Sequence, residues 1–123
     1  MKINESAENY LETIYILSNK IGAVRSIDIV HELGYSKPSV SVAMKHLREN
    51  NYIKTDKDGY ITLTITGREI AARIFERHYV LTNSLISIGV TPEVAADDAC
   101  RIEHVISAET FEAIKTYIHK KED

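Results

Sequence analysis

Residues 26–63 constrain the fold more than any other stretch, because two short helical patterns there are followed at once by a pattern typical of strands. The first helix is expected to have Ser26 as its cap and to end at Gly34. Ser36 and Pro38 then have the residue types that open a second helix. The buried side of the first helix is predicted at Ile27, Val30 and Leu33. Two helices joined by so short a turn are typical of a helix-turn-helix.

The repeat of apolar residues changes after this pair of helices. Asn50-Asn51 is expected to close the second helix, whose apolar side is predicted at Val40, Met44 and Leu47. Residues 52–55 and 60–63 are rich in β-prone side chains, and residues 56–59 have turn chemistry. A hairpin can occur in any small α+β domain. This order and spacing, with a polar outer face on the second helix, favour a winged helix-turn-helix that binds DNA.

The remaining segments are predicted to be helical. A first helix is expected to be capped by Ser6 and ended by Gly22, with an apolar side made of Tyr10, Ile14, Leu17 and Ile21. After the hairpin, three more helices are expected to open at Thr66, Thr91 and Ser107.

The predicted fold class is therefore mainly α with a small β-hairpin. Residues 1–66 are expected to form the winged helix-turn-helix DNA-binding domain, and residues 67–123 a helical domain. The helices of the second domain carry more apolar side chains than they can bury alone, which predicts a dimer interface.

Charge and composition limit the classes of function. The net charge of −3 does not indicate nucleic-acid binding, but residues 37–57 carry five basic and two acidic side chains. Such a patch can bind phosphate, although an ordinary solvated surface has the same composition. No apolar run approaches the length of a membrane span, and the N-terminus has no apolar signal core, so we expect a cytoplasmic protein. The single cysteine fits a reducing compartment.

The polar side of the second helix of the pair is the predicted DNA-reading surface. Serine hydroxyls and lysine ammonium groups suit phosphates and base edges, and Pro38 and Val42 offer apolar contact to thymine methyl groups. No arginine or glutamine stands on this face before Arg48, so DNA shape is expected to contribute to recognition. The predicted DNA-binding residues, including two lysines of the hairpin, are Ser36, Lys37, Pro38, Ser39, Ser41, Val42, Lys45, Lys54 and Lys57.

A second polar surface is predicted late in the chain. Cys100, Glu103 and His104 have the spacing of residues that project from one side of a helix. Their side chains suit a divalent transition metal whose other ligands lie elsewhere. Taken alone, the three residues fit a solvated polar face better, because this spacing is no ligand signature by itself. A catalytic pair of Cys100 and His104 is disfavoured by its geometry, so no enzyme is expected.

Five segments together resemble the metal-dependent repressors of the diphtheria toxin repressor and manganese repressor family, and the pair Glu103-His104 is the most specific part. The segments are residues 8–15, 36–41, 64–68, 77–78 and 98–107. The resemblance implies a winged helix-turn-helix followed by a helical dimerisation and metal-binding domain, without the family's optional C-terminal SH3-like domain. The implied activity is metal-activated repression by a homodimer that binds double-stranded operators of iron- or manganese-uptake genes.

The resemblance also implies, by position, the metal ligands Asn9, Glu12, His78, Cys100, Glu103 and His104. Glu12 matches the manganese branch and Cys100 the iron branch, whereas Asn9 stands where one branch has an Asp and the other a Met. Thr82 and Ala96 replace the ligands of the iron branch's second site, so no such site is expected. The expected metal is Fe(II) or Mn(II), followed by Zn(II) or Co(II).

Glu12 belongs to the DNA-binding half, whereas the second half carries the ligands His78, Cys100, Glu103 and His104. A metal bound by ligands from both halves would therefore fix the two halves to each other. The alternative prediction is a winged-helix regulator that senses a non-metal small molecule and uses the polar cluster structurally. Dimer binding to DNA that is unaffected by a chelator would favour this alternative.

Overall fold

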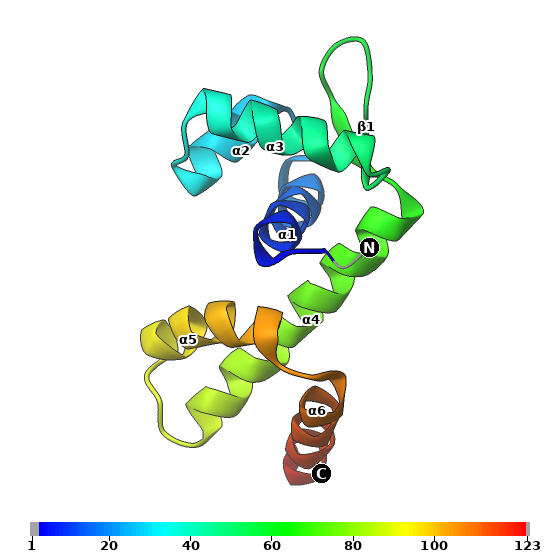
Figure 1. The fold of residues 1–123 in the computed structure, drawn as a ribbon. Coiled ribbons are helices and arrows are strands. Elements are labelled where there is room, and N and C mark those ends of the chain that lie inside the picture. The colour runs from blue at the N-terminus through cyan, green and yellow to red at the C-terminus, as the bar shows by residue number, and fades with distance from the viewer. Residues whose placement is uncertain (1–2, 123) are drawn as a thin grey trace. The chain divides into compact units, whose positions relative to one another are not determined.

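The computed structural model describes residues 3–122, which form six helices and one two-stranded hairpin (Figure 1). The elements are α1 (Glu5–Ile21), α2 (Ser26–Leu33), α3 (Lys37–Glu49), β1 (Ile53–Thr55), β2 (Ile61–Leu63), α4 (Ile65–Ser87), α5 (Pro92–Val105) and α6 (Ala108–Glu122). The predicted mainly α class with a small hairpin is confirmed. The chain forms two compact units that meet within α4, one up to Ala72 and one from Arg73.

The first unit packs the helix-turn-helix and the hairpin around α1. Leu11 and Ile14 of α1 are fully buried in its core, as are Val24, Ile29 and Val40. Gly34 adopts the left-handed conformation (φ 70°) that ends α2, and the Ser36 hydroxyl accepts a hydrogen bond from the Ser39 amide (3.2 Å). Both predicted signals of the turn are therefore confirmed.

An aromatic contact fixes the same turn to α1. The ring of Tyr35, in the turn, packs edge-on against Tyr10, with ring centroids 6.0 Å apart. Burial raises the pKa of the Tyr10 phenol, and the neighbouring Tyr35 raises it further. Because an ordinary tyrosine already titrates near pH 10, the Tyr10 phenol stays neutral at physiological pH.

Two predicted helix starts before the hairpin are wrong by one or two residues. Asn4, not Ser6, caps α1, because its Oδ1 accepts a hydrogen bond from the Ala7 amide (2.8 Å). Arg25, not Ser26, is the capping position of α2, and its amide donates to the Asp28 carboxylate (2.8 Å). At α1 the Asn4 side chain provides the cap, whereas at α2 the carboxylate of Asp28, inside the first turn, accepts from the backbone amide of Arg25.

Two predicted core positions are also wrong. Ile27 is 38% exposed and Ile21 is 50% exposed, whereas Ile29 is fully buried. Ile29 shares one face of α2 with Val30 and Leu33, and Ile27 lies at the edge of that face. Ile27 lies three residues before Val30, a spacing that also suits a buried helix face. The periodicity of apolar residues alone therefore could not decide whether Ile27 or Ile29 is buried.

The hairpin is joined to the start of the helix-turn-helix. Its strands are antiparallel with Ile53 opposite Leu63, and Ile61 also pairs with Val24, whose carbonyl accepts from the Ile61 amide (2.7 Å). Next to this pair, the Arg25 guanidinium lies over the Tyr60 ring, 4.4 Å from its centroid. The wing is therefore anchored to α2 through backbone and side chain.

The beginning of α4 passes very close to the hairpin. Thr64, not the predicted Thr66, caps this helix, because its hydroxyl oxygen accepts from the Gly67 amide (3.1 Å) while donating to the Asn51 carbonyl (2.8 Å). A Cβ atom at Gly67 would overlap the carbonyl oxygen of Tyr52. Glycine is therefore needed here for close backbone approach.

The second unit contains most of α4 with α5 and α6. Ser107 caps α6 as predicted, since its hydroxyl oxygen accepts from the Thr110 amide (3.1 Å). Phe111 is buried, whereas Tyr117 is 58% exposed. Apolar side chains of the three helices line a cavity of about 410 Å³, among them Leu81, Leu85, Ile102, Ile114 and Ile118. Within residues 3–122, no helix combines the length and apolar character that a membrane crossing requires.

Candidate functional site

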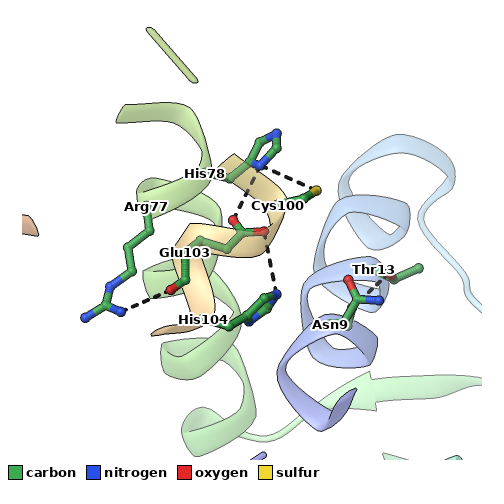
Figure 2. Close-up of polar contacts among 7 residues, drawn as sticks. All are labelled: Asn9, Thr13, Arg77, His78, Cys100, Glu103 and His104. Carbon is green, nitrogen blue, oxygen red and sulfur yellow. Dashed lines mark hydrogen bonds and ion pairs between the residues drawn. The ribbon is translucent and has the colours of Figure 1, made fainter. Parts of the chain in front are cut away.

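Three potential metal ligands meet in the second unit, one from α4 and two from α5. The ligand atoms of His78, Cys100 and Glu103 all lie within 4.8 Å of one another (Figure 2). His78 Nδ1 is 3.4 Å from Glu103 Oε2 and 3.9 Å from Cys100 Sγ. Cys100 and Glu103 are adjacent because they lie three residues apart on one helix face, and the packing of α4 against this face adds His78.

The Glu103 carboxylate is the most unusual group of this cluster. Its side chain is completely buried, and neither oxygen has a hydrogen-bond donor within the part of the chain that the structure describes. An ionised carboxylate without donors is costly to bury, because it loses its hydration without replacement. A cation bound beside it would compensate that cost, and the set of thiolate, imidazole and carboxylate fits a divalent transition metal.

His104 lies on the opposite side of the same carboxylate. Its Nε2 is 3.7 Å from Glu103 Oε1, and its side chain is only 4% exposed. Figure 2 shows the carboxylate between the two imidazole rings, with His78 at one oxygen and His104 at the other. His104 adjoins Glu103, but it does not belong to the cluster of His78, Cys100 and Glu103, whose ligand atoms lie within 4.8 Å of one another.

The two remaining predicted ligands belong to α1 in the first unit. The Glu12 side chain is buried, with the residue 7% exposed. The backbone carbonyl of Asn9 accepts a hydrogen bond from the Thr13 hydroxyl (2.9 Å), which leaves the Asn9 side chain uninvolved in that bond (Figure 2). A buried glutamate on α1 is a second carboxylate that could serve a cation.

The predicted DNA-binding residues belong to the first unit, where the structure leaves their side chains accessible. All nine are exposed, whereas Val40, Met44 and Leu47 of α3 face the core. Val42 is 54% exposed, so its methyl groups are accessible to the methyl group of a base. The hydroxyls of Ser36 and Ser39 already hydrogen-bond each other (2.8 Å), so both also stabilise the start of α3.

Two arginines with structural roles at these surfaces were not predicted. Arg25 stacks on Tyr60 at the base of the wing, and Arg77 donates hydrogen bonds to carbonyls at the end of α5. Arg25 lies outside the basic stretch 37–57, and its position immediately before α2 is the signal that could have drawn attention to it. The contacts of Arg77 span more than 25 residues and have no local signal.

Comparison with protein families gives two matches that together span almost the entire chain. Residues 2–61 match the family described as the iron dependent repressor, N-terminal DNA binding domain. Residues 64–123 match the iron dependent repressor, metal binding and dimerisation domain. The first match contains α3 and the hairpin up to the first residue of β2, and the second contains His78, Cys100, Glu103 and His104.

Individual relatives agree with these matches. Transcriptional regulator MntR of Escherichia coli O157:H7 is 34% identical over 116 residues, which are 94% of this chain and 75% of that protein. HTH-type transcriptional regulator MntR of Bacillus velezensis is 32% identical over 118 residues, which are 96% of this chain and 83% of that protein.

Solved structures have the same fold. The manganese regulator SloR superimposes with a TM-score of 0.82 at 25% identity, and IdeR of T. acidophilum with 0.79 at 26% identity. Each comparison covers 97% of this chain and 55% of the other, so the chain spans about half the length of these two structures.

Proposed function

The chain belongs to the iron-dependent repressor family, and we propose that Fe(II) or Mn(II), bound through the Glu103 cluster, activates operator binding by a dimer of this chain. Membership confirms the predicted class, a metal-dependent transcriptional repressor that controls manganese or iron homeostasis and is not an enzyme. The observation that carries the proposal is the buried Glu103 carboxylate, which has no hydrogen-bond donor among residues 3–122.

The proposed ligands are His78, Cys100, Glu103 and His104, with Glu12 and Asn9 contributed by α1. When bound, the metal supplies positive charge that neutralises the buried carboxylates and coordination bonds that hold its ligands together. His78 and His104 flank Glu103 at 3.4 and 3.7 Å, so both imidazoles adjoin the carboxylate that would hold the cation. Asn9 has only a neutral carbonyl oxygen to offer, and is proposed as a weaker ligand.

Glu12 gives the proposed site its regulatory role. It belongs to the unit that carries α3 and the wing, whereas the other acidic ligand belongs to the second unit. Coordination by both would restrict the DNA-binding unit, and in a dimer it would favour the separation of the two α3 helices that suits half-sites about 34 Å apart. A few kcal/mol of differential metal binding is enough to shift such an equilibrium.

A titration of operator binding with metal tests the proposal directly. Mn(II), anaerobic Fe(II), Co(II) and Zn(II) would be added at buffered free concentrations, with chelated protein as the reference. We expect operator affinity to rise with Fe(II) or Mn(II), with Zn(II) and Co(II) binding tightly whatever their physiological role. Operator affinity that is the same in chelator and in all four metals would refute metal activation.

Replacing Cys100 is expected to change the preference among metals. A serine hydroxyl is a harder and weaker ligand than a thiolate, so Cys100→Ser should lose on the order of tenfold in Zn(II) and Co(II) affinity, about 1.4 kcal/mol. Mn(II) affinity should change much less. Competition with a chromophoric chelator measures each dissociation constant. An equal loss for all metals would instead indicate a general disturbance of the site.

DNA contact is proposed for α3 and the wing. Ser36, Lys37, Pro38, Ser39, Ser41, Val42 and Lys45 of the helix, with Lys54 and Lys57 of the hairpin, present hydroxyl, ammonium and apolar groups on one exposed surface. Lys45 is only loosely paired with Glu49, 4.0 Å away with both side chains exposed, so it is available to a phosphate.

Loss of the charge at the tip of the wing is expected to weaken binding to all DNA sequences alike. Lys57→Gln should remove one phosphate contact, so the slope of log affinity against log salt concentration should become shallower by about 0.9. Lys57→Arg, which keeps the charge, is the matched control and should retain the slope. Fluorescence anisotropy with operator and unrelated duplexes measures both. An unchanged slope in Lys57→Gln would exclude this lysine from the interface.

The homodimer is proposed to form through the second unit. Its apolar cavity and several exposed apolar side chains, among them Ile86, Ile88 and Val105, are candidates for burial against a second copy.

The proposed boundary between the DNA-binding domain and the helical domain lies between residues 66 and 67, near the start of α4. A regulator of this type acts on chromosomal DNA, so we propose a cytoplasmic location.

A further inference from the structure

Arg77 contacts the end of α5, the helix that carries three of the proposed ligands. One nitrogen of its guanidinium donates to the backbone carbonyl of Glu103 (3.1 Å), as Figure 2 shows. The same nitrogen donates to the backbone carbonyl of Ile106 (3.0 Å), and both bonds are partly buried. The last carbonyls of a helix have no partner within the helix, so an arginine placed there satisfies them and complements the negative end of the helix dipole. Arg77 therefore acts as a side-chain cap for α5, although it belongs to α4.

Two contacts of Glu103 come from neighbouring residues of α4. Arg77 holds its backbone carbonyl, and His78 lies 3.4 Å from its carboxylate. The same glutamate is therefore positioned at its backbone and at its side chain by consecutive residues. Rotation or sliding of α5 would move the carboxylate away from His78 and would break the bond to Arg77 at the same time.

Arg77 also contacts the connection to α6 and α6 itself. Ile106 lies between the end of α5 at Val105 and the cap of α6 at Ser107. The guanidinium lies over the buried ring of Phe111, 5.5 Å from its centroid. Farther along α6, Ile114 and Ile118 line the apolar cavity. One side chain thus joins the ligand-bearing helix to the helix that lines the proposed dimer surface.

We infer that Arg77 is a positioning residue that sets metal affinity, by fixing Glu103 on α5 and by fixing α5 against α6. This inference rests on the proposed metal site. Outer partners that orient metal ligands typically change metal affinity by roughly 10- to 100-fold when they are lost. Arg77 would act in this way through the backbone of Glu103 without touching the metal.

The test uses Co(II) as the probe, because a thiolate ligand gives Co(II) a charge-transfer absorption that reports coordination by Cys100. In the full chain, Arg77→Gln is expected to weaken Co(II) binding roughly 10-fold or more and to change the Co(II) absorption spectrum. Arg77→Lys should give an intermediate affinity, since its ammonium keeps the charge but lacks the planar guanidinium that lies over the Phe111 ring. Arg101→Gln is the matched control, because Arg101 lies on α5 beside Cys100 with its side chain 77% exposed.

A purely structural role would lower thermal stability equally with and without metal and would leave the Co(II) affinity and spectrum unchanged, and that result would overturn the inference. If Arg77→Gln does not fold, Arg77→Lys decides, and wild-type affinity and spectrum in that variant overturn it equally. Glu103→Gln, measured in parallel, separates this inference from the proposed function. Loss of Co(II) binding in Glu103→Gln but not in the Arg77 variants refutes only the role of Arg77, whereas normal binding in Glu103→Gln refutes the metal site.

Discussion

Glu103→Gln is expected to abolish metal-stimulated operator binding while leaving a folded dimer. The amide keeps the shape of the side chain but removes the negative charge that two imidazoles and a thiol surround. Loss of a ligand should cost at least as much metal affinity as loss of an outer partner, roughly 10- to 100-fold. Anisotropy of labelled operator DNA with and without Mn(II) measures the stimulation, and analytical ultracentrifugation measures the dimer.

The stability of this variant without metal provides a second readout. In the metal-free wild type, a buried carboxylate without a hydrogen-bond donor destabilises the fold. The neutral amide avoids part of that cost, so thermal unfolding of the metal-free variant should occur at the same temperature as wild type or above it. Asp97→Asn, on an exposed face of the same helix, is the matched control. Wild-type metal stimulation in Glu103→Gln would show that the site lies elsewhere.

Gly67→Ala is expected to destabilise the first unit strongly. The new methyl group would overlap the carbonyl oxygen of Tyr52, which accepts hydrogen bonds from the Thr64 amide (3.1 Å) and the Thr64 hydroxyl (3.1 Å). Relief of the overlap requires α4 to move away from the hairpin and to strain these bonds. Overpacking of this kind costs about 1–3 kcal/mol, and each kcal/mol lowers the unfolding temperature of a small domain by about 4–8 °C.

Thr66→Ala is the control for Gly67→Ala. Thr66 is exposed and adjacent in α4, so its replacement improves helix propensity without any overlap. Urea unfolding followed by circular dichroism should show a lower midpoint for Gly67→Ala and an unchanged or higher midpoint for Thr66→Ala. Equal midpoints for the two variants would mean that the backbones of α4 and the hairpin can separate at no cost.

The sequence predicted every helix and strand because their signals are local. Gly34, Ser36 and Pro38 act on the backbone within a few residues, and the structure has the helix-turn-helix they indicate. Errors occurred where two local solutions were equivalent, as for Ser6 against Asn4 and for Ile27 against Ile29. The Thr64 cap was missed because its second bond goes to Asn51, across the hairpin.

The residues of the candidate site also divide into those with a local sequence signal and those without one. The spacing of Cys100 and Glu103 on one helix predicted that they would lie together, and their ligand atoms do so. His78 entered only through a family resemblance, because nothing in its own neighbourhood indicates a partner 25 residues away in Glu103. The absence of a donor for the carboxylate and the contacts of Arg77 are properties of packed helices, and no local pattern encodes them.

The short backbone pairing between Val24 and Ile61 has a consequence for solubility. A hairpin that is exposed, as the proposed DNA contact requires, also offers unpaired backbone groups to the hairpins of other molecules, which is how sheets associate edge to edge. Here each strand has only three residues, and at Ile61 the outer edge of β2 is already occupied by Val24. Lys54 adds a charge to β1. The wing can therefore stay uncovered without becoming a template for aggregation.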